Sequence, residues 1–165
     1  MKVSILYYSR TGNTRTMAHY IAEGIERVEG MKAGVFSIDD IDEDFALESD
    51  GFIFGTPTYV GGPAAEMYSF LVNEVVRYRI AGKLAGVFAT EQYVHGGADV
   101  AMLRMAESLM VYGMMLYSGG GSYGRPVIHF GPVEVSPDTE KYRELFVTYG
   151  ERFARQLKII STHGK

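Results

Sequence analysis

A segment of six residues near the start of the chain combines hydroxyl, amide and glycine groups. It reads Ser-Arg-Thr-Gly-Asn-Thr, and a run of apolar residues with helical spacing follows it. The first turn of a helix presents unpaired N–H groups and the positive end of the helix dipole, which together attract a phosphate group. An ordinary helix cap by Asn13 or Thr11 is the alternative, but the clustering favours a site for a phosphate monoester. Its residues are Ser9, Arg10, Thr11, Gly12, Asn13 and Thr14.

A second loop, Gly55 to Pro63, follows another apolar run and suits a flat ring. Pro57 stiffens the backbone, the glycines allow it to approach a ring closely, and Tyr59 offers an aromatic face. The residues that we expect at the ring are Pro57, Thr58, Tyr59, Val60 and Gly61.

A third loop, Thr90 to Gly97, is again polar, aromatic and rich in glycine. Its backbone and the amide of Gln92 can bond the polar edge of a heterocycle, and Tyr93 or His95 can cover the ring. Each loop taken singly is more often a plain turn, but three such loops together indicate one binding site. The residues assigned here are Thr90, Glu91, Gln92, Tyr93, His95, Gly96 and Gly97.

The elements that must position these loops alternate along the chain. Five short runs are mostly apolar and show no sustained alternation between apolar and polar residues, which predicts strands buried on both faces. The stretches between them have apolar residues at helical spacing. This pattern predicts an α/β fold with a parallel sheet in the order 2-1-3-4-5, in which ligands bind beyond strands 1, 3 and 4. We expect a single domain over residues 1–165. The apolar runs are residues 3–8, 33–38, 51–56, 84–90 and 114–118.

The phosphate segment in its context, YYSRTGNT, resembles the phosphate loop of the flavodoxin family. The stretches GTPTYVGGPAAEMYSFL, GKLAGVFAT and HGGAD resemble the WrbA-like NAD(P)H:quinone oxidoreductases, which share the flavodoxin fold. The resemblance extends along almost the whole chain. It implies a flavodoxin-like three-layer sandwich and non-covalent FMN, bound by Ser9 to Thr14, Thr58 to Val60 and Thr90 to Gly97. It also implies reduction of quinones by NAD(P)H.

Two departures from the WrbA-like pattern bear on activity. Family members often have a His-His-Gly sequence after the fourth helix, with a histidine near the flavin, whereas this chain has Val111-Tyr112-Gly113. Tyr112 can stack or donate a hydrogen bond, but its ordinary pKa is too high for proton donation near neutrality. We expect it near the flavin and assign no catalytic acid or base. The family's tryptophan-containing stretch is shortened here to residues 73–82.

Three functions remain open. The first is an FMN-dependent oxidoreductase that passes electrons from NAD(P)H to a quinone or a similar small acceptor. The second is a flavodoxin that carries single electrons between protein partners, and the third is an interaction protein that has lost FMN. The intact phosphate segment disfavours the third.

The charge distribution favours the enzyme over the carrier. The net charge is −4, and residues 38–50 hold seven acids and no base. The rest of the chain has 13 acids and 16 bases, a net charge of +3. Carrier flavodoxins tend to be strongly acidic around the flavin, and this negative charge steers them to basic partners. Outside residues 38–50, this chain lacks such an excess of acidic residues. The same balance excludes extended nucleic-acid binding, which needs clustered Lys and Arg.

Composition sets further limits. The chain has no cysteine, which excludes disulfides, thiolate metal sites and a cysteinyl flavin link, and the four histidines show no metal-binding spacing. No apolar run approaches the 18 or so residues of a spanning helix. We expect a cytoplasmic protein without membrane insertion or a metal. The irregular segment Gly119 to Pro137 is a candidate functional or subunit-contact loop, and the resemblance suggests a homo-dimer or homo-tetramer.

Overall fold

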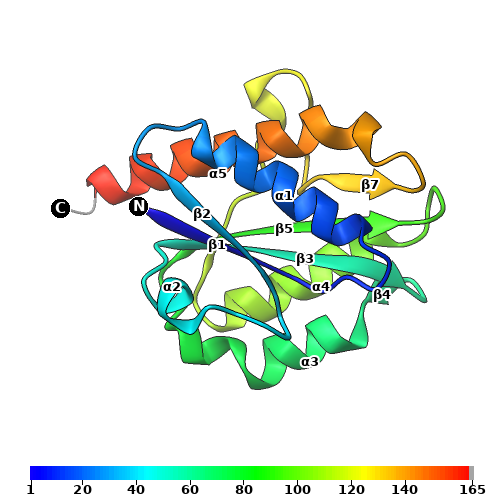
Figure 1. Ribbon diagram of the computed structural model, residues 1–165, viewed down its shortest axis with the longest axis horizontal. Helices are drawn as coiled ribbons and strands as arrows, with labels where there is room; N and C mark the ends of the chain where they lie inside the picture. Colours follow the sequence, from blue (N-terminus) through cyan, green and yellow to red (C-terminus); the bar gives the residue numbers. More distant parts are fainter. Residues whose placement is uncertain (164–165) are drawn as a thin grey trace.

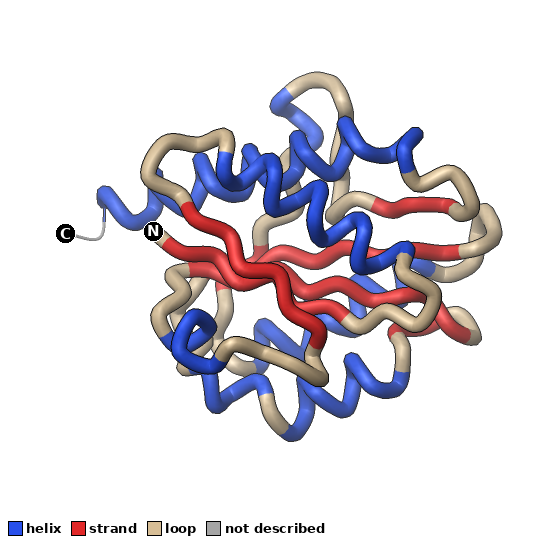
Figure 2. Tube along the Cα trace, viewed as in Figure 1, coloured by secondary structure: helices blue, strands red, loops and turns tan. Residues whose placement is uncertain are grey.

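The computed structural model describes residues 1–163, whose core is a parallel sheet with helices on both faces. The strands lie in the order β2-β1-β3-β5-β6, and Figure 2 shows them in red between the helices. Their bounds are β1 Lys2–Tyr7, β2 Lys32–Ser37, β3 Gly51–Tyr59, β5 Leu84–Glu91 and β6 Met115–Leu116. Counted along the chain without the added short strands, this is the predicted order 2-1-3-4-5, and the predicted flavodoxin-like α/β fold is confirmed.

The central strands show why their sequences lack alternation. Each of the first seven residues of β3 and of β5 is buried, because helices cover both faces of the sheet. Five neighbouring residues of β1 are buried as well. Strands in this position need apolar or small side chains on both faces.

Figure 1 shows α1 and α5 on one face of the sheet and α3 and α4 on the other, and α2 shares the face of α3 and α4. Each face has its own apolar cluster, with Ile5, Ile53 and Phe88 on the α1 side and Leu6, Phe54 and Ala89 on the α4 side. The α-helices are α1 Asn13–Glu26, α2 Glu43–Leu47, α3 Ala65–Asn73, α4 Ala98–Val111 and α5 Arg143–His163. The 3-10 helices are η1 Val75–Tyr78, η2 Gly121–Tyr123 and η3 Glu140–Tyr142. Within residues 1–163, the helices are all too short or too polar to cross a membrane.

The packing of α1 against α5 depends on two glycines. A Cβ atom at Gly24 would lie 1.9 Å from the carbonyl oxygen of Val147, and one at Gly150 would lie 2.1 Å from that of Ile21. The two helix backbones therefore touch where they cross, which fixes the position of α1 over the sheet.

Two short strands add to the expected topology. β4 (Gly62–Pro63) forms an antiparallel hairpin with β3, and β7 (Val133–Val135) lies parallel to β5 beyond the short β6. The segment predicted to be irregular, Gly119 to Pro137, thus contains a strand. The fifth strand position is divided between β6 and β7, and residues 117–132 leave the sheet between them as the yellow loop of Figure 1. Arg152 holds this loop by donating to the carbonyls of Pro126 at 3.0 Å and Gly119 at 3.2 Å.

Candidate functional site

An open cleft of about 1120 Å³ lies at the carboxyl ends of the strands. These strand ends are at the right in Figure 1. Parallel strands all end at the same edge, so the loops after β1, β3 and β5 meet there. The three loops singled out in the sequence form its walls, together with two residues that follow β7. The volume suits a ligand of nucleotide size. The lining residues are Arg10, Thr11, Asn13, Pro57, Thr58, Tyr59, Val60, Gly61, Thr90, Glu91, Gln92, Tyr93, Gly96, Ser136 and Pro137.

One end of the cleft is the start of α1. The helix begins after Gly12, whose φ of 101° lies in the left-handed region that favours glycine. It has no side-chain cap and no acidic residue in its first turn. The first hydrogen bond within the helix runs from the Thr16 N–H to the Gly12 carbonyl, at 2.9 Å, so the N–H groups of Asn13, Thr14 and Arg15 precede the helical ladder. This helix start is therefore an uncompensated positive end, suited to an anion.

The side chains of this segment hold it in place. The buried Thr14 places its hydroxyl 2.9 Å from that of Thr90 on β5, and the Asn13 amide donates to the Ser136 hydroxyl at 2.6 Å. Ser9 accepts from the Gly12 N–H at 3.1 Å. The helix start is thus tied to β5 and to the segment that follows β7, and its first backbone N–H groups remain as donors for a ligand.

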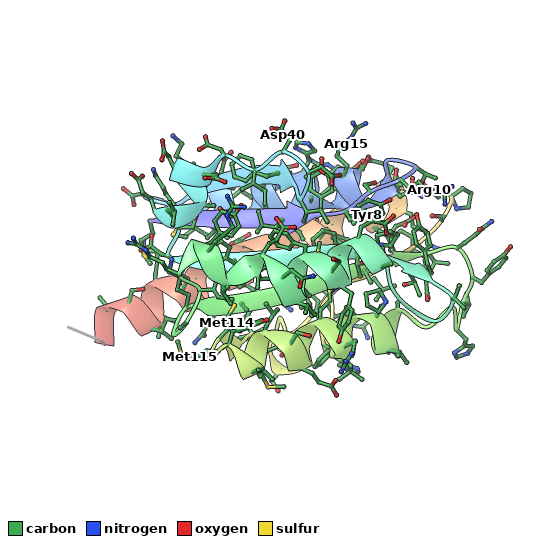
Figure 3. All side chains as sticks on the ribbon, turned by 90° about the horizontal axis from the view of Figure 1, so that it is seen from below. Tyr8, Arg10, Arg15, Asp40, Met114 and Met115 are labelled. Carbon is green, nitrogen blue, oxygen red and sulfur yellow. The ribbon has the colours of Figure 1, made fainter. Side chains whose placement is uncertain are left out.

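Arg10 brings a positive charge to the mouth of the cleft. Figure 3 shows Arg10 and Tyr8 at the same end of the molecule, and the Tyr8 hydroxyl donates to a carboxylate oxygen of Glu66 at 2.8 Å. Burial raises the pKa of Tyr59 above the usual tyrosine value, and the charge of Arg10 opposes that shift. Tyr59 is therefore a neutral aromatic wall at physiological pH.

The hairpin between β3 and β4 places Val60 at the tip of the second loop. Thr58 pairs with Pro63 and Tyr59 with Gly62, which leaves Val60 and Gly61 as a two-residue turn. Both have positive φ, 51° and 74°, the combination found in a tight hairpin turn. A β-branched residue is strained in this region, and the fully exposed Val60 gains no burial in return. The pairing of β3 with β4 on either side of the turn therefore holds the Val60 backbone in this unfavourable conformation.

Thr58 supplies an unused polar group in the wall of the cleft. Its hydroxyl oxygen is buried and has no hydrogen-bond partner within the described residues. A buried hydroxyl without a partner costs roughly 1–3 kcal/mol. A ligand with a polar edge in the cleft would satisfy it.

The third loop closes the other side of the cleft. Glu91 accepts from the Ala98 N–H at 3.1 Å and so caps the start of α4. Tyr93 and Val94 are exposed, and His95 has a positive φ of 64°. A Cβ atom at Gly97 would lie 2.7 Å from the Cα of Gly61, so the second and third loops touch through their glycines.

The cleft brings together most of the residues assigned from the sequence, but Tyr112 does not join them. It follows α4, whose 14 residues span about 21 Å at the helical rise. It therefore lies at the opposite edge of the sheet, where its hydroxyl donates to the Val72 carbonyl at 3.2 Å. The expected place of Tyr112 beside the ring is corrected accordingly. Ser9, Gly12, Thr14, His95 and Gly97 are not in the cleft lining but adjoin residues that are.

Sequence reasoning placed Ser136 and Pro137 only in a candidate functional or subunit-contact segment and did not assign them to the binding site, whereas they line the cleft beside Asn13. They reach it because β7 pairs with β5 after the long excursion of residues 117–132. The one local signal is the turn-forming pair Ser-Pro directly after an apolar and β-branched run.

Comparisons with known proteins agree with this geometry. Residues 5–102 match the family profile described as flavodoxin. A flavodoxin of Clostridium saccharobutylicum is 39% identical, over 97% of this chain and 99% of the relative. An NAD(P)H dehydrogenase (quinone) of Aromatoleum aromaticum is 30% identical, over 70% of this chain and 69% of the relative. Among solved structures, a flavodoxin, WrbA-like protein from Agrobacterium tumefaciens superposes with a TM-score of 0.78 over 95% of this chain and 97% of that one, at 24% identity, and so shows the same fold.

Proposed function

The chain belongs to the flavodoxin family, and we propose that it binds FMN in this cleft and carries single electrons between protein partners. Proteins of this family hold FMN without a covalent bond. The observation that carries the proposal is the pairing, in one cleft, of an uncapped helix start with a buried hydroxyl that has no partner.

The phosphate of FMN is assigned to the start of α1. The N–H groups of Asn13, Thr14 and Arg15 lie at the positive end of the helix dipole, and no carboxylate in the first turn opposes a phosphate there. Arg10 adds a cation at the same end of the cleft. These groups bind a dianion by charge and by hydrogen bonds.

The flavin ring is assigned to the space between the second and third loops. Tyr59 and Tyr93 offer aromatic faces, Thr58 offers the unpaired hydroxyl, and Gln92 offers an amide for the polar edge of the ring. The bound ring supplies the redox chemistry, and the protein orients it and covers part of its surface.

The residues at the open side of the cleft favour electron transfer to a protein. Val60 and Tyr93, which line the cleft, and Val94, which follows Tyr93, are large apolar or aromatic side chains exposed to solvent. Exposed side chains of this kind suit contact with another protein surface. Among the cleft-lining residues, Glu91 is engaged in capping α4 and the pKa of Tyr59 is raised by burial. The lining thus offers the ring no histidine or free carboxylate for proton transfer near neutral pH. The full-length similarity to a flavodoxin supports the same choice.

Reduction of a quinone by NAD(P)H is the second candidate. The chain is 30% identical to an NAD(P)H dehydrogenase (quinone) over 70% of its length. The net charge of +3 outside residues 38–50 suits anionic small molecules better than a basic protein partner.

One experiment separates the two candidates. The FMN-loaded protein is mixed with NADPH and a benzoquinone, and its flavin absorbance is followed. In parallel, a stepwise titration with dithionite measures the number of reduction steps. A carrier shows two resolved one-electron steps and no appreciable turnover of NADPH. Rapid bleaching by NADPH with catalytic quinone reduction would instead establish the reductase.

A further inference from the structure

Glu134 is a buried acid that the proposed site does not use. It lies on β7 with 0% of its surface exposed, and its Oε1 atom has no hydrogen-bond partner within the described residues. A buried carboxyl of this kind is costly, especially when ionised. Such a residue, bonded to the cleft-lining Ser136, calls for a functional explanation.

A short chain of hydrogen bonds joins Glu134 to the phosphate end of the cleft. The amide of Asn13, in the first turn of α1, donates to the Ser136 hydroxyl at 2.6 Å. That hydroxyl in turn donates to the Oε2 atom of Glu134 at 3.3 Å. One uncharged serine thus separates the carboxyl from the helix start that would hold the phosphate.

The register of the sheet gives an independent link. Glu134 pairs directly with Thr90 on β5, so the two side chains share a face of the sheet. Thr90 shares a hydrogen bond with Thr14 in the first turn of α1. Glu134 therefore lies near the beginning of α1, and two links connect them. One is the chain of hydrogen bonds through Ser136 to Asn13, and the other is the strand pairing with Thr90, which bonds to Thr14.

No opposite charge among the described residues is seen to neutralise this carboxyl. The ionisable side chains on the elements around it are exposed or have other partners; Arg143, for example, pairs with Glu23. Burial raises the pKa of Glu134 above the usual value, and the hydrogen bond from Ser136 opposes this shift. The surrounding ionisable residues are Glu91 on β5, Arg15 and His19 on α1, Asp138 and Glu140 after β7, and Arg143 and Glu144 on α5.

We propose that Glu134 is a positioning residue for the FMN phosphate, which supports the phosphate loop when it is protonated and weakens phosphate binding when it is ionised. The proposal rests on the proposed FMN site. The protonated carboxyl accepts from Ser136 and keeps Asn13 in place without adding charge. The ionised carboxyl sets a negative charge beneath a phosphate dianion in a low-dielectric region.

The sign of the effect follows from linkage. Bound phosphate disfavours ionised Glu134, so it raises the pKa of that carboxyl in the complex above its pKa in the free protein. As pH rises through the interval between these two values, the free protein loses the proton and FMN binding must recover it. The dissociation constant then increases about tenfold for each pKa unit of difference. Replacing Glu134 by glutamine removes this increase.

The experiment compares the wild type with Glu134→Gln at several pH values from about pH 5, just above the ordinary glutamate pKa, to about pH 8. The dissociation constants of FMN and riboflavin are measured for both proteins. The FMN phosphate itself titrates in this pH range, but equally for both proteins. The ratio of the wild-type dissociation constant to that of the variant therefore cancels this contribution. Riboflavin has the same ring without the phosphate and is the matched ligand control.

We expect the FMN ratio, wild type over variant, to rise with pH by at least about tenfold, while the riboflavin ratio stays constant. A constant FMN ratio, or an equal rise with riboflavin, overturns the role of Glu134. If neither flavin binds the wild type, the proposed function fails and the inference with it. Carbon-13 NMR of the Glu134 carboxyl in the wild type gives a test that does not depend on the variant folding: its pKa must be higher with FMN than with riboflavin.

Discussion

Gly61 and Gly97 are in direct backbone contact, although 36 positions separate them in the sequence, so that a Cβ atom on Gly97 would lie 2.7 Å from the Cα of Gly61. This contact joins the loop after β3 to the loop after β5. It sets the spacing of the two walls between which we place the flavin ring.

Replacing Gly97 with alanine should separate these walls. The new Cβ meets backbone, and the φ of +101° is strained for alanine, so we expect a loss of about 2–4 kcal/mol in the free energy of unfolding and weaker binding of both FMN and riboflavin. Gly82→Ala is the matched control, because Gly82 has a φ of +75° and open space around it. It should lose only the strain, about 1–2 kcal/mol. Equal losses for the two variants in chemical denaturation would show that the contact is unimportant.

Thr14 and Thr90 should behave as a coupled pair. Their hydroxyl oxygens are 2.9 Å apart in a buried position. Thr14→Val or Thr90→Val alone leaves a buried hydroxyl unpaired and should destabilise the apoprotein by about 1–3 kcal/mol. The double variant should cost much less than the sum of the singles. A double-mutant cycle by urea denaturation measures this, and additive losses would mean that the hydrogen bond contributes nothing.

Thr11→Glu tests the phosphate end of the cleft. Thr11 is exposed and lines the cleft beside the start of α1, so the new carboxylate faces the phosphate without disturbing the core. We expect FMN affinity to fall by at least about tenfold, or about 1.4 kcal/mol, with little change for riboflavin. His19→Glu adds an acid to the exposed side of the same helix and should have little effect. Calorimetric titration measures both variants, and unchanged FMN affinity in Thr11→Glu would place the phosphate elsewhere.

Thr58→Val tests the ring end. The Thr58 hydroxyl has no partner within the described residues, so its removal should leave the apoprotein as stable as before or slightly more stable. If the flavin ring forms a hydrogen bond with this hydroxyl, the variant should bind both FMN and riboflavin more weakly. The loss of binding free energy should be roughly 1 kcal/mol for each ligand. A destabilised apoprotein with unchanged flavin affinity would contradict the assignment.

Much of the fold could be predicted from the sequence, because buried parallel strands and amphipathic helices leave local patterns. The apolar runs at residues 51–56 and 84–90 correspond to β3 and β5, and the three loops that follow β1, β3 and β5 meet as predicted. Strand order then follows from the rules for right-handed crossovers and from the resemblance.

The parts that could not be predicted depend on contacts between distant segments. β7 pairs with β5 only after the chain returns from the excursion of residues 117–132, so no local pattern places Ser136 in the cleft or Glu134 beneath α1. The family pattern predicts Tyr112 near the flavin. The length of α4 carries it instead to the far edge of the sheet.

The most direct test of the account is titration of the apoprotein with FMN and with riboflavin, followed by the quenching of flavin fluorescence. Stacking on Tyr59 or Tyr93 should quench the ring, and the helix start should add the phosphate contribution. We predict one FMN bound per chain, at least about tenfold more tightly than riboflavin. Absence of saturable FMN binding, or equal affinity for both ligands, would contradict the account.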